Sequence, residues 1–420
     1  MIRANDGTKM GHSFKWEAQV SNQAQLIRAL LVATLWLGMG SFLWAAGTET
    51  ASRTALTVSD KKALVAKYAM LIGSHQFDEM EKITSQLLSQ YQVKAISGDL
   101  LLAHMQAMVP DNGKGMLSDL EEWRRQKPKS YAANCVLGIQ YFQLGASARG
   151  GAWTKDTSSD KIAEMSKYML LAEDTLWKSV PLFAKPYPSY SMLINVAARM
   201  GTKDAQKAAL NKVIRFDSDA VGVYQKYILY HTPRWGGDYG EIDKIVEFAK
   251  KTPMAKANIA ILEAYVLACR AEDEEDLHQN PAGAIDFWID AYQRNPGKKQ
   301  VSWLYSAAKD ARAAKQIDRA IQIYSRIVTD FKDEDLAFFM RGVIYHEDKQ
   351  DYKKAFDDSL SSAALGNRSA QNNVGYYYMT GKGVPKNLEL AKKYFKLSAD
   401  QGFEHAKEKL KLLEAGQVPP

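Results

Sequence analysis

The stretch that decides the fold is Ala370–Leu413, AQNNVGYYYMTGKGVPKNLELAKKYFKLSADQGFEHAKEKLKLL. Its pattern predicts three helices, with a glycine-punctuated turn after the first and a glycine stop after the second. Small and aromatic residues recur at the spacing of one apolar helical face, at Gly375, Tyr378, Ala391, Phe395 and Ala399. Because small residues let two antiparallel helices approach closely, we expect a helical hairpin followed by a further helix.

The same pattern returns upstream at a regular distance. The small residues early in the second helix of each predicted hairpin are Ala284, Ala320, Ala355 and Ala391, which lie 36, 35 and 36 residues apart. A period of this length is typical of tetratricopeptide-type helical repeats. Ala406 and Leu410 follow Ala370 and Val374 at the same spacing of 36, so we expect the final helix to cap the stack.

The unit Ser369–Gly402 resembles the Sel-one-like subfamily of tetratricopeptide-related repeats. The resemblance rests on Gly381-Lys-Gly-Val-Pro385 between its helices, and on Asn367 and Phe403 at the positions of the loop between repeats. It implies that the glycines allow the turn and that Val384-Pro385 starts the second helix. The upstream units differ in this loop, so the resemblance to the subfamily covers the last unit.

From about Ser59 onward the chain reads as successive amphipathic helices, without a convincing period-two strand. We expect an all-α fold, a right-handed α-solenoid of tetratricopeptide/Sel-like helical hairpins after an N-terminal membrane-targeting helix. In such a stack neighbouring hairpins bury one another's apolar faces, and the first helices line a binding groove. The predicted organisation is a cytoplasmic leader (1–28), a signal peptide or membrane anchor (29–47), a helical domain (59–253), a repeat domain (254–413) and a tail (414–420).

Residues 29–46, ALLVATLWLGMGSFLWAA, carry no charge and follow Arg28. At about 1.5 Å per residue this helix would span roughly 27 Å, enough for a bilayer core. The positive flank predicts a cytoplasmic N-terminus and places the chain after Gly47 in the periplasm. Ala45-Ala46-Gly47 suits signal peptidase, whereas the long leader favours an uncleaved inner-membrane anchor unless Met10 is the start. A buried globular helix is the third alternative, although it would lack a polar face.

Charge and motifs argue against most other classes. The net charge of +7 comes from 55 basic and 48 acidic residues without an arginine-rich run, so we expect no nucleic-acid partner. The sequence has no His-Glu-x-x-His, Gly-x-Ser-x-Gly, P-loop or Cys-x-x-Cys motif, so we expect no enzymatic activity, cofactor or metal. The acidic runs Glu121-Glu122 and Asp273–Asp276 point different ways around a helix, which indicates solvated surface. A metal site in the second run is the alternative.

Cys135 and Cys269 stand in apolar helical runs. We interpret each as a small buried apolar residue. Because the predicted compartment is oxidising, a disulfide between them is the alternative.

Four residues of the last unit are candidates for the binding groove: Asn372, Asn373, Tyr376 and Tyr377. Aromatic and amide groups suit a peptide backbone, although tyrosines at this density also pack between helices. The leading interpretation is a scaffold or adaptor module in the bacterial envelope that binds a protein or peptide partner. Contact with the membrane would run through residues 29–46 if that segment is not cleaved.

Two loops support a different function. Ala148-Arg149-Gly150 with the nearby Trp153, and Pro233-Arg234-Trp235-Gly-Gly237, combine residues that can build a sugar or anion pocket. The alternative function is therefore a glycan- or anion-binding protein, or an enzyme, with its site at these loops. If the loops are helix connectors instead, Trp235 packs a corner and the head group of Arg234 is partly solvated.

These two loops, together with Pro128-Lys-Ser130, resemble an uncharacterised bacterial domain found ahead of repeat modules in proteobacteria. The resemblance covers roughly Leu64–Pro253. The Pro-Arg-Trp-Gly-Gly string is its most specific motif. The resemblance implies no activity.

Overall fold

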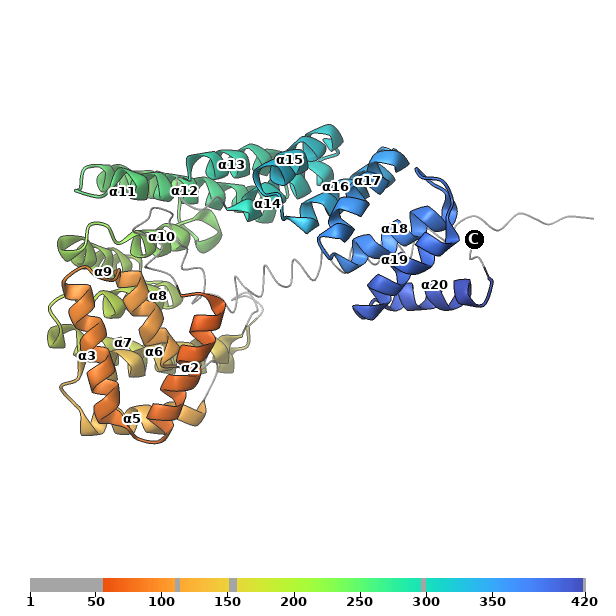
Figure 1. Cartoon of the computed structure of the whole chain (residues 1–420). Helices are drawn as coiled ribbons and strands as arrows, with labels where there is room; N and C mark the ends of the chain where they lie inside the picture. The colour runs from red at the N-terminus through yellow and green to blue at the C-terminus, as the bar shows by residue number, and fades with distance from the viewer. Residues whose placement is uncertain (1–55, 110–113, 151–156, 296–299, 418–420) are drawn as a thin grey trace, which may run out of the picture. The chain divides into compact units, whose positions relative to one another are not determined.

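The computed structural model describes residues 56–109, 114–150, 157–295 and 300–417. Every regular element in these ranges is helical, with nineteen α-helices, α2 to α20, joined by short turns and 3-10 segments. Figure 1 shows the helices following one another along the chain as packed hairpins. The all-α prediction is therefore confirmed for the described residues, whereas residues 29–46, predicted to target a membrane, lie outside them.

The chain divides into two compact units between Tyr227 and Ile228, inside α10 (Val221–Tyr230). The domain boundary inferred from the sequence, between residues 253 and 254, stays a prediction. None of the described helices combines the length and the apolar character needed to cross a bilayer.

The first unit is built from helices that pack against their neighbours in the chain, most extensively α6 against α7 and α8 against α9. Its helices before α10 are α2 (Val58–Gly73), α3 (Phe77–Gln92), α4 (Gly98–Ala107), α5 (Leu117–Gln126), α6 (Tyr131–Arg149), α7 (Ser159–Ser179), α8 (Tyr187–Met200) and α9 (Lys203–Phe216). A Cβ at Gly138 would lie 2.6 Å from the Leu176 side chain, so glycine lets α6 approach α7 closely. Trp123 is fully buried, and its Nε1 donates to Glu81 Oε1 at 2.8 Å.

The second unit continues the hairpins through the repeat region. Its helices are α11 (Tyr239–Lys250), α12 (Lys256–Asp276), α13 (Pro281–Arg294), α14 (Val301–Ala313), α15 (Ile317–Asp330), α16 (Asp335–Glu347), α17 (Tyr352–Ala364), α18 (Arg368–Thr380), α19 (Leu388–Asp400) and α20 (Glu404–Glu414). From α12 to α20 each helix packs against the next one.

The repeat core follows the predicted spacing. The four small residues 35 or 36 apart are all fully buried: Ala284, Ala320, Ala355 and Ala391. A Cβ at Gly375 would lie 2.8 Å from the ring of Phe395, so the glycine lets α18 approach α19. The predicted close approach of the two helices is therefore found in the last hairpin, and the small residue of each of the four hairpins is buried as the spacing predicts.

The start of α19 corrects one expectation. The resemblance implied that Val384-Pro385 begins the second helix of the last hairpin, whereas α19 begins at Leu388. The reason is local capping, because the Asn387 side chain accepts a hydrogen bond from Leu390 N at 3.0 Å. Gly381, in the left-handed region with φ +76°, ends α18 as predicted for a turn glycine.

Cys135 and Cys269 are both buried free thiols, as the interpretation of small core residues requires. Burial raises the pKa of Cys135 to about 11. Burial also raises the pKa of Cys269, with Glu272 adding to the effect.

Candidate binding surfaces of the repeat unit

The Pro-Arg-Trp-Gly-Gly string forms a tight turn between α10 and α11. Pro233–Trp235 make one 3-10 turn, and Gly236 follows in the left-handed region with φ +73°. At Gly237 a Cβ would lie only 2.0 Å from the carbonyl oxygen of His231, so no larger residue fits there. The Trp235 indole is half-buried and meets the ring of Tyr230 edge to face, with centroids 5.3 Å apart. This geometry favours the packing-corner interpretation of Trp235.

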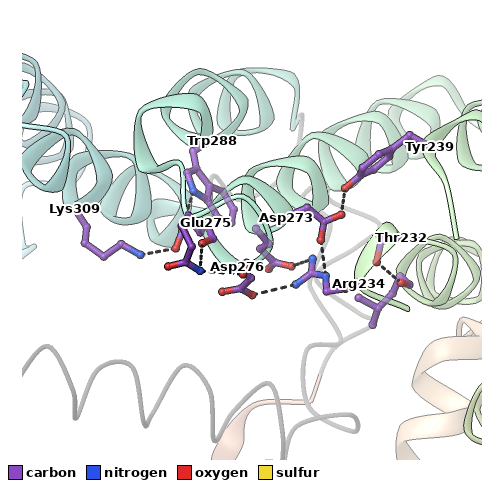
Figure 2. Close-up of polar contacts among 11 residues, drawn as sticks. Thr232, Arg234, Tyr239, Asp273, Glu275, Asp276, Trp288 and Lys309 are labelled. Atoms are coloured by element: carbon purple, nitrogen blue, oxygen red, sulfur yellow. Dashed lines mark hydrogen bonds and ion pairs between the residues drawn. The ribbon is translucent and has the colours of Figure 1, made fainter. Parts of the chain in front are cut away.

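Arg234 points from this turn to the last turns of α12 (Figure 2). Its Nε lies 2.9 Å from Asp273 Oδ1 and its Nη1 lies 3.7 Å from Asp276 Oδ2, while Nη2 pairs with Glu272. Tyr239 OH donates to the other oxygen of Asp273 at 2.6 Å. The carboxylate of Asp273, which is almost completely buried, thus joins α12 to the turn and to α11.

The pKa values of Arg234 and Glu272 depend on their burial and on the charges paired with them. Burial would lower the pKa of Arg234, but the carboxylates of Glu272 and Asp273 outweigh it and raise that pKa. Burial raises the pKa of Glu272, against the opposing effect of Arg234. Arg234 therefore stays charged and has its guanidinium occupied by carboxylates of its own chain.

Two expectations from the sequence are wrong at this point. The Arg234 side chain is only 13% exposed rather than partly solvated. Asp273, interpreted as part of a solvated acidic run, is 2% exposed. Successive residues point about 100° apart around a helix, and the end of α12 is covered on more than one side. The same acidic run therefore faces both the turn and the next hairpin.

The second polar node joins α12, α13 and α14 around the indole of Trp288, which is 4% exposed. Trp288 Nε1 lies 2.8 Å from Glu275 Oε1 and 3.2 Å from Asp310 Oδ2 (Figure 2 labels Trp288 and Glu275). Lys309 Nζ bridges the same two carboxyl groups, at 2.7 Å from Glu275 and 3.4 Å from Asp310.

The pKa values of the two carboxyl groups at this node shift in opposite directions. Burial, reinforced by the neighbouring Glu275 and opposed by Lys309, raises the pKa of Asp310 to about 8. For Glu275 burial is outweighed by Lys309 and by the hydrogen bonds from its neighbours, so the pKa of Glu275 is lowered. The pair therefore retains a proton to higher pH than a solvated carboxyl group does. In the part of the chain that the structure describes, no group of three His, Cys, Asp or Glu side chains is arranged to hold a metal ion.

The first unit contains the other predicted loop residue. Arg149 ends α6, and burial together with the charge of Arg199 lowers its pKa. Trp153 lies outside the described residues. Arg149 belongs to the first unit and Arg234 to the second, so a pocket that combines the two loops stays a prediction.

The first unit also holds a cationic group that the sequence analysis did not single out. Lys226 Nζ donates to Ser191 Oγ, and burial lowers the pKa of Lys226 to about 8. A serine beside a partly neutral lysine is the arrangement of an activated nucleophile. Ser191 is fully buried, however, so the pair contributes to the interior of the unit rather than to a reactive surface.

Of the four groove candidates in the last hairpin, only Tyr376 is more than slightly exposed. Asn372 and Asn373 are each 7% exposed and Tyr377 is 2% exposed. Tyr377 OH lies 2.8 Å from His346 Nδ1 on α16, so it joins two hairpins. Asn372 Oδ1 has no hydrogen-bond partner among the described residues. The alternative of packing between helices therefore fits all of them except Tyr376.

Tyr376 is flanked by two lysines. Lys382 Nζ donates to Tyr376 OH at 3.0 Å and lies 5.5 Å from the ring centroid. Lys409, from α20, places its Nζ 5.4 Å from the same centroid, and Lys382 also lies over Tyr352 at 5.2 Å. We call Tyr352, Tyr376, Lys382 and Lys409 the Tyr376 surface. Lys409 follows Asn373 by 36 residues, so the repeat spacing could have marked it as a position of interest.

One protein family matches part of this architecture. Residues 368–403 match the Sel1 repeat family, which confirms the resemblance of Ser369–Gly402. The chain is therefore a helical-repeat protein with tetratricopeptide-like hairpins that carries a Sel1 repeat near its C-terminal end. The match does not reach the region 64–253, whose resemblance to an uncharacterised proteobacterial domain stays a prediction.

Two solved structures resemble the chain at low identity. A Sel1 repeat protein from Oxalobacter formigenes is 17% identical, with 78% of this chain and 89% of that chain covered at a TM-score of 0.30. A human IFIT1 dimer with PPP-AAAA is 10% identical, with 82% and 85% covered at a TM-score of 0.30. At this TM-score neither likeness is evidence about function. No curated protein matches the sequence.

Proposed function

We propose that this chain is a protein-interaction scaffold or adaptor, which binds a protein or peptide partner through its helical repeats and catalyses no reaction. The observation that carries the proposal is the Sel1 repeat at residues 368–403, set in a continuous run of hairpins from α12 to α20. Stacked hairpins bury their apolar faces against each other, which leaves an extended outer surface for ligands. Repeats of this family are commonly protein-binding scaffolds.

We further propose that the scaffold works in the bacterial envelope. The support is the uncharged segment 29–46 behind Arg28, which favours export of everything after Gly47. The protein would then be periplasmic, either soluble after signal cleavage or anchored in the inner membrane by one helix.

The alternative, a glycan- or anion-binding protein or an enzyme, loses support at the Arg234–Trp235 loop. A guanidinium that recognises a ligand anion must offer unpaired donors. Arg234 instead pairs with Glu272, Asp273 and Asp276, so a bound anion would have to displace carboxylates already in place. The scaffold is the function that these contacts support better.

The experiment is affinity capture of the full chain, tagged at its C-terminus, from an envelope fraction after brief crosslinking. A scaffold should enrich the same partner in replicate captures, close to one partner per chain. A matched capture with Gly375→Leu, which drives a larger side chain into the Phe395 ring and disrupts the last hairpin, should lose that partner. If the wild-type chain enriches no protein above an untagged control, the proposal is wrong.

A further inference from the structure

The lysines of the last hairpins fall into two groups. On α17, α19 and α20, most lysines that make a polar contact form an ion pair with a carboxylate of their own helix. Examples are Lys353 with Asp357 and Lys407 with Glu404. Lys382 and Lys409 have no carboxylate within 4 Å among the described residues, and both lie against aromatic rings instead. Their positive charge is therefore not neutralised by an ion pair.

Burial of an ammonium group without a carboxylate partner is most pronounced at Lys409. Its ammonium lies between the rings of Tyr376 and Phe395, at 5.4 Å and 5.5 Å from their centroids. Burial lowers the pKa of Lys409, while Glu408 opposes the shift only in part. A partly desolvated ammonium without a carboxylate gains more from an incoming anion than a solvated surface lysine does.

Two acidic groups lie near this surface, and neither forms an ion pair with its lysines. Glu347, at the end of α16, pairs with Arg312 of the preceding hairpin. Glu408 is 74% exposed and lies 3.7 Å from His405 on the same helix. Neither carboxylate is within ion-pair distance of Lys382 or Lys409, so the positive character of the Tyr376 surface is kept.

We infer that the Tyr376 surface binds an acidic peptide segment of a partner protein, with one carboxylate at Lys382, a second at Lys409 and the Tyr376 ring between them. This inference rests on the proposed function as a protein-binding scaffold and names the chemistry of the partner.

The geometry also limits the spacing of the two acidic residues. The Lys382 ammonium lies at the hydroxyl edge of Tyr376 and the Lys409 ammonium 5.4 Å from the ring centroid, so the two nitrogens are at most about 11 Å apart. In an extended segment, side chains two residues apart point the same way and lie about 7 Å apart. The spacing of acidic residues at alternate positions of an extended peptide falls within this limit, and the backbone between them would lie over the aromatic ring.

The test uses the full chain and two fluorescein-labelled ten-residue peptides, one with Glu-x-Glu at its centre and one with Gln-x-Gln at the same positions. The wild-type chain should bind the acidic peptide at least about tenfold more tightly than the neutral one, and the difference should shrink as salt is raised. The double variant K382Q/K409Q should lose this preference. The double variant K393Q/K411Q removes the same charge from two exposed positions on α19 and α20 and should keep it.

The outcomes separate this inference from the proposed function. Equal binding of both peptides, or unchanged preference in K382Q/K409Q, overturns the acidic-segment inference. If envelope capture enriches a partner equally with wild type and K382Q/K409Q, the scaffold stands and the partner binds elsewhere. If capture enriches nothing while the Glu-x-Glu preference is present and depends on both lysines, the surface recognises carboxylates but the proposed scaffold function fails.

Discussion

Arg234 and Asp273 form an ion pair, Nε to Oδ1 at 2.9 Å, with side chains only 13% and 3% exposed. Arg234 belongs to the turn before α11 and Asp273 to α12, so the pair fixes the turn against the first long helix of the second unit. A pair this buried contributes to stability mainly through what its removal leaves behind, because an uncompensated charge inside the protein is costly.

Arg234→Ala should therefore destabilise the protein by about 3–5 kcal/mol, since it leaves Asp273 and Glu272 without their cation. Equilibrium unfolding in urea measures the loss. Arg319→Ala is the matched control, because Arg319 pairs with the exposed Asp286 and should cost less than about 1 kcal/mol. Equal stabilities of the two variants would contradict the assignment of Arg234 as a buried anchor.

The free energy of unfolding should depend on pH through the ionisation of Asp310. Its pKa is raised to about 8 in the folded state, whereas an unfolded Asp titrates near 3.9. Between these values the folded state holds a proton that the unfolded state has lost, so stability falls as pH rises from about 4 to about 8. Glu275 acts in the opposite direction only below its ordinary range, because its folded pKa is lowered.

Asp310→Asn removes this titration while keeping the size of the side chain. Urea unfolding between pH 4 and pH 9 should show that the variant loses less stability than wild type as pH rises to 8. The difference between the two proteins should grow across this range and become constant above it. Curves of identical slope would show that Asp310 is ionised in the folded protein at neutral pH.

The repeat core could be predicted because it depends on local spacing. Ala284, Ala320, Ala355 and Ala391 recur at a fixed distance, and burial of each follows from the same helix-on-helix contact. The start of α19 could not be predicted from Val384-Pro385, because the side chain of Asn387 caps the helix, which begins at Leu388, three residues after Pro385.

The candidate site was harder to predict because its contacts join distant positions. Arg234 and Glu272 are 38 residues apart, and the sequence shows only an arginine in a turn and an acidic run on a helix. The Tyr376 surface likewise depends on Lys409 of α20, two helices after Tyr376, and no sequence motif distinguishes this lysine from the others. Only the repeat register relates such a position to the preceding hairpin.

Topology can be tested without knowing the partner. A periplasm-dependent reporter fused after Leu413 should be active, because the positive flank precedes the apolar segment 29–46. The same fusion lacking residues 29–46 is the control and should be inactive. Activity of a cytoplasm-dependent reporter at the same position, with the periplasmic one silent, would overturn the proposed export.

Ala391 tests the register of the Sel1 repeat itself. It is fully buried on α19, one turn before Phe395, whose ring lies against Gly375 of α18. Ala391→Trp must force a large indole between two helices that already touch, so it should cost at least about 1–3 kcal/mol. The control is Lys393→Trp, two residues along on the exposed side of the same helix, which should change the melting temperature little. If both variants have the melting temperature of the wild type, the face of α19 that packs against α18 has been assigned wrongly.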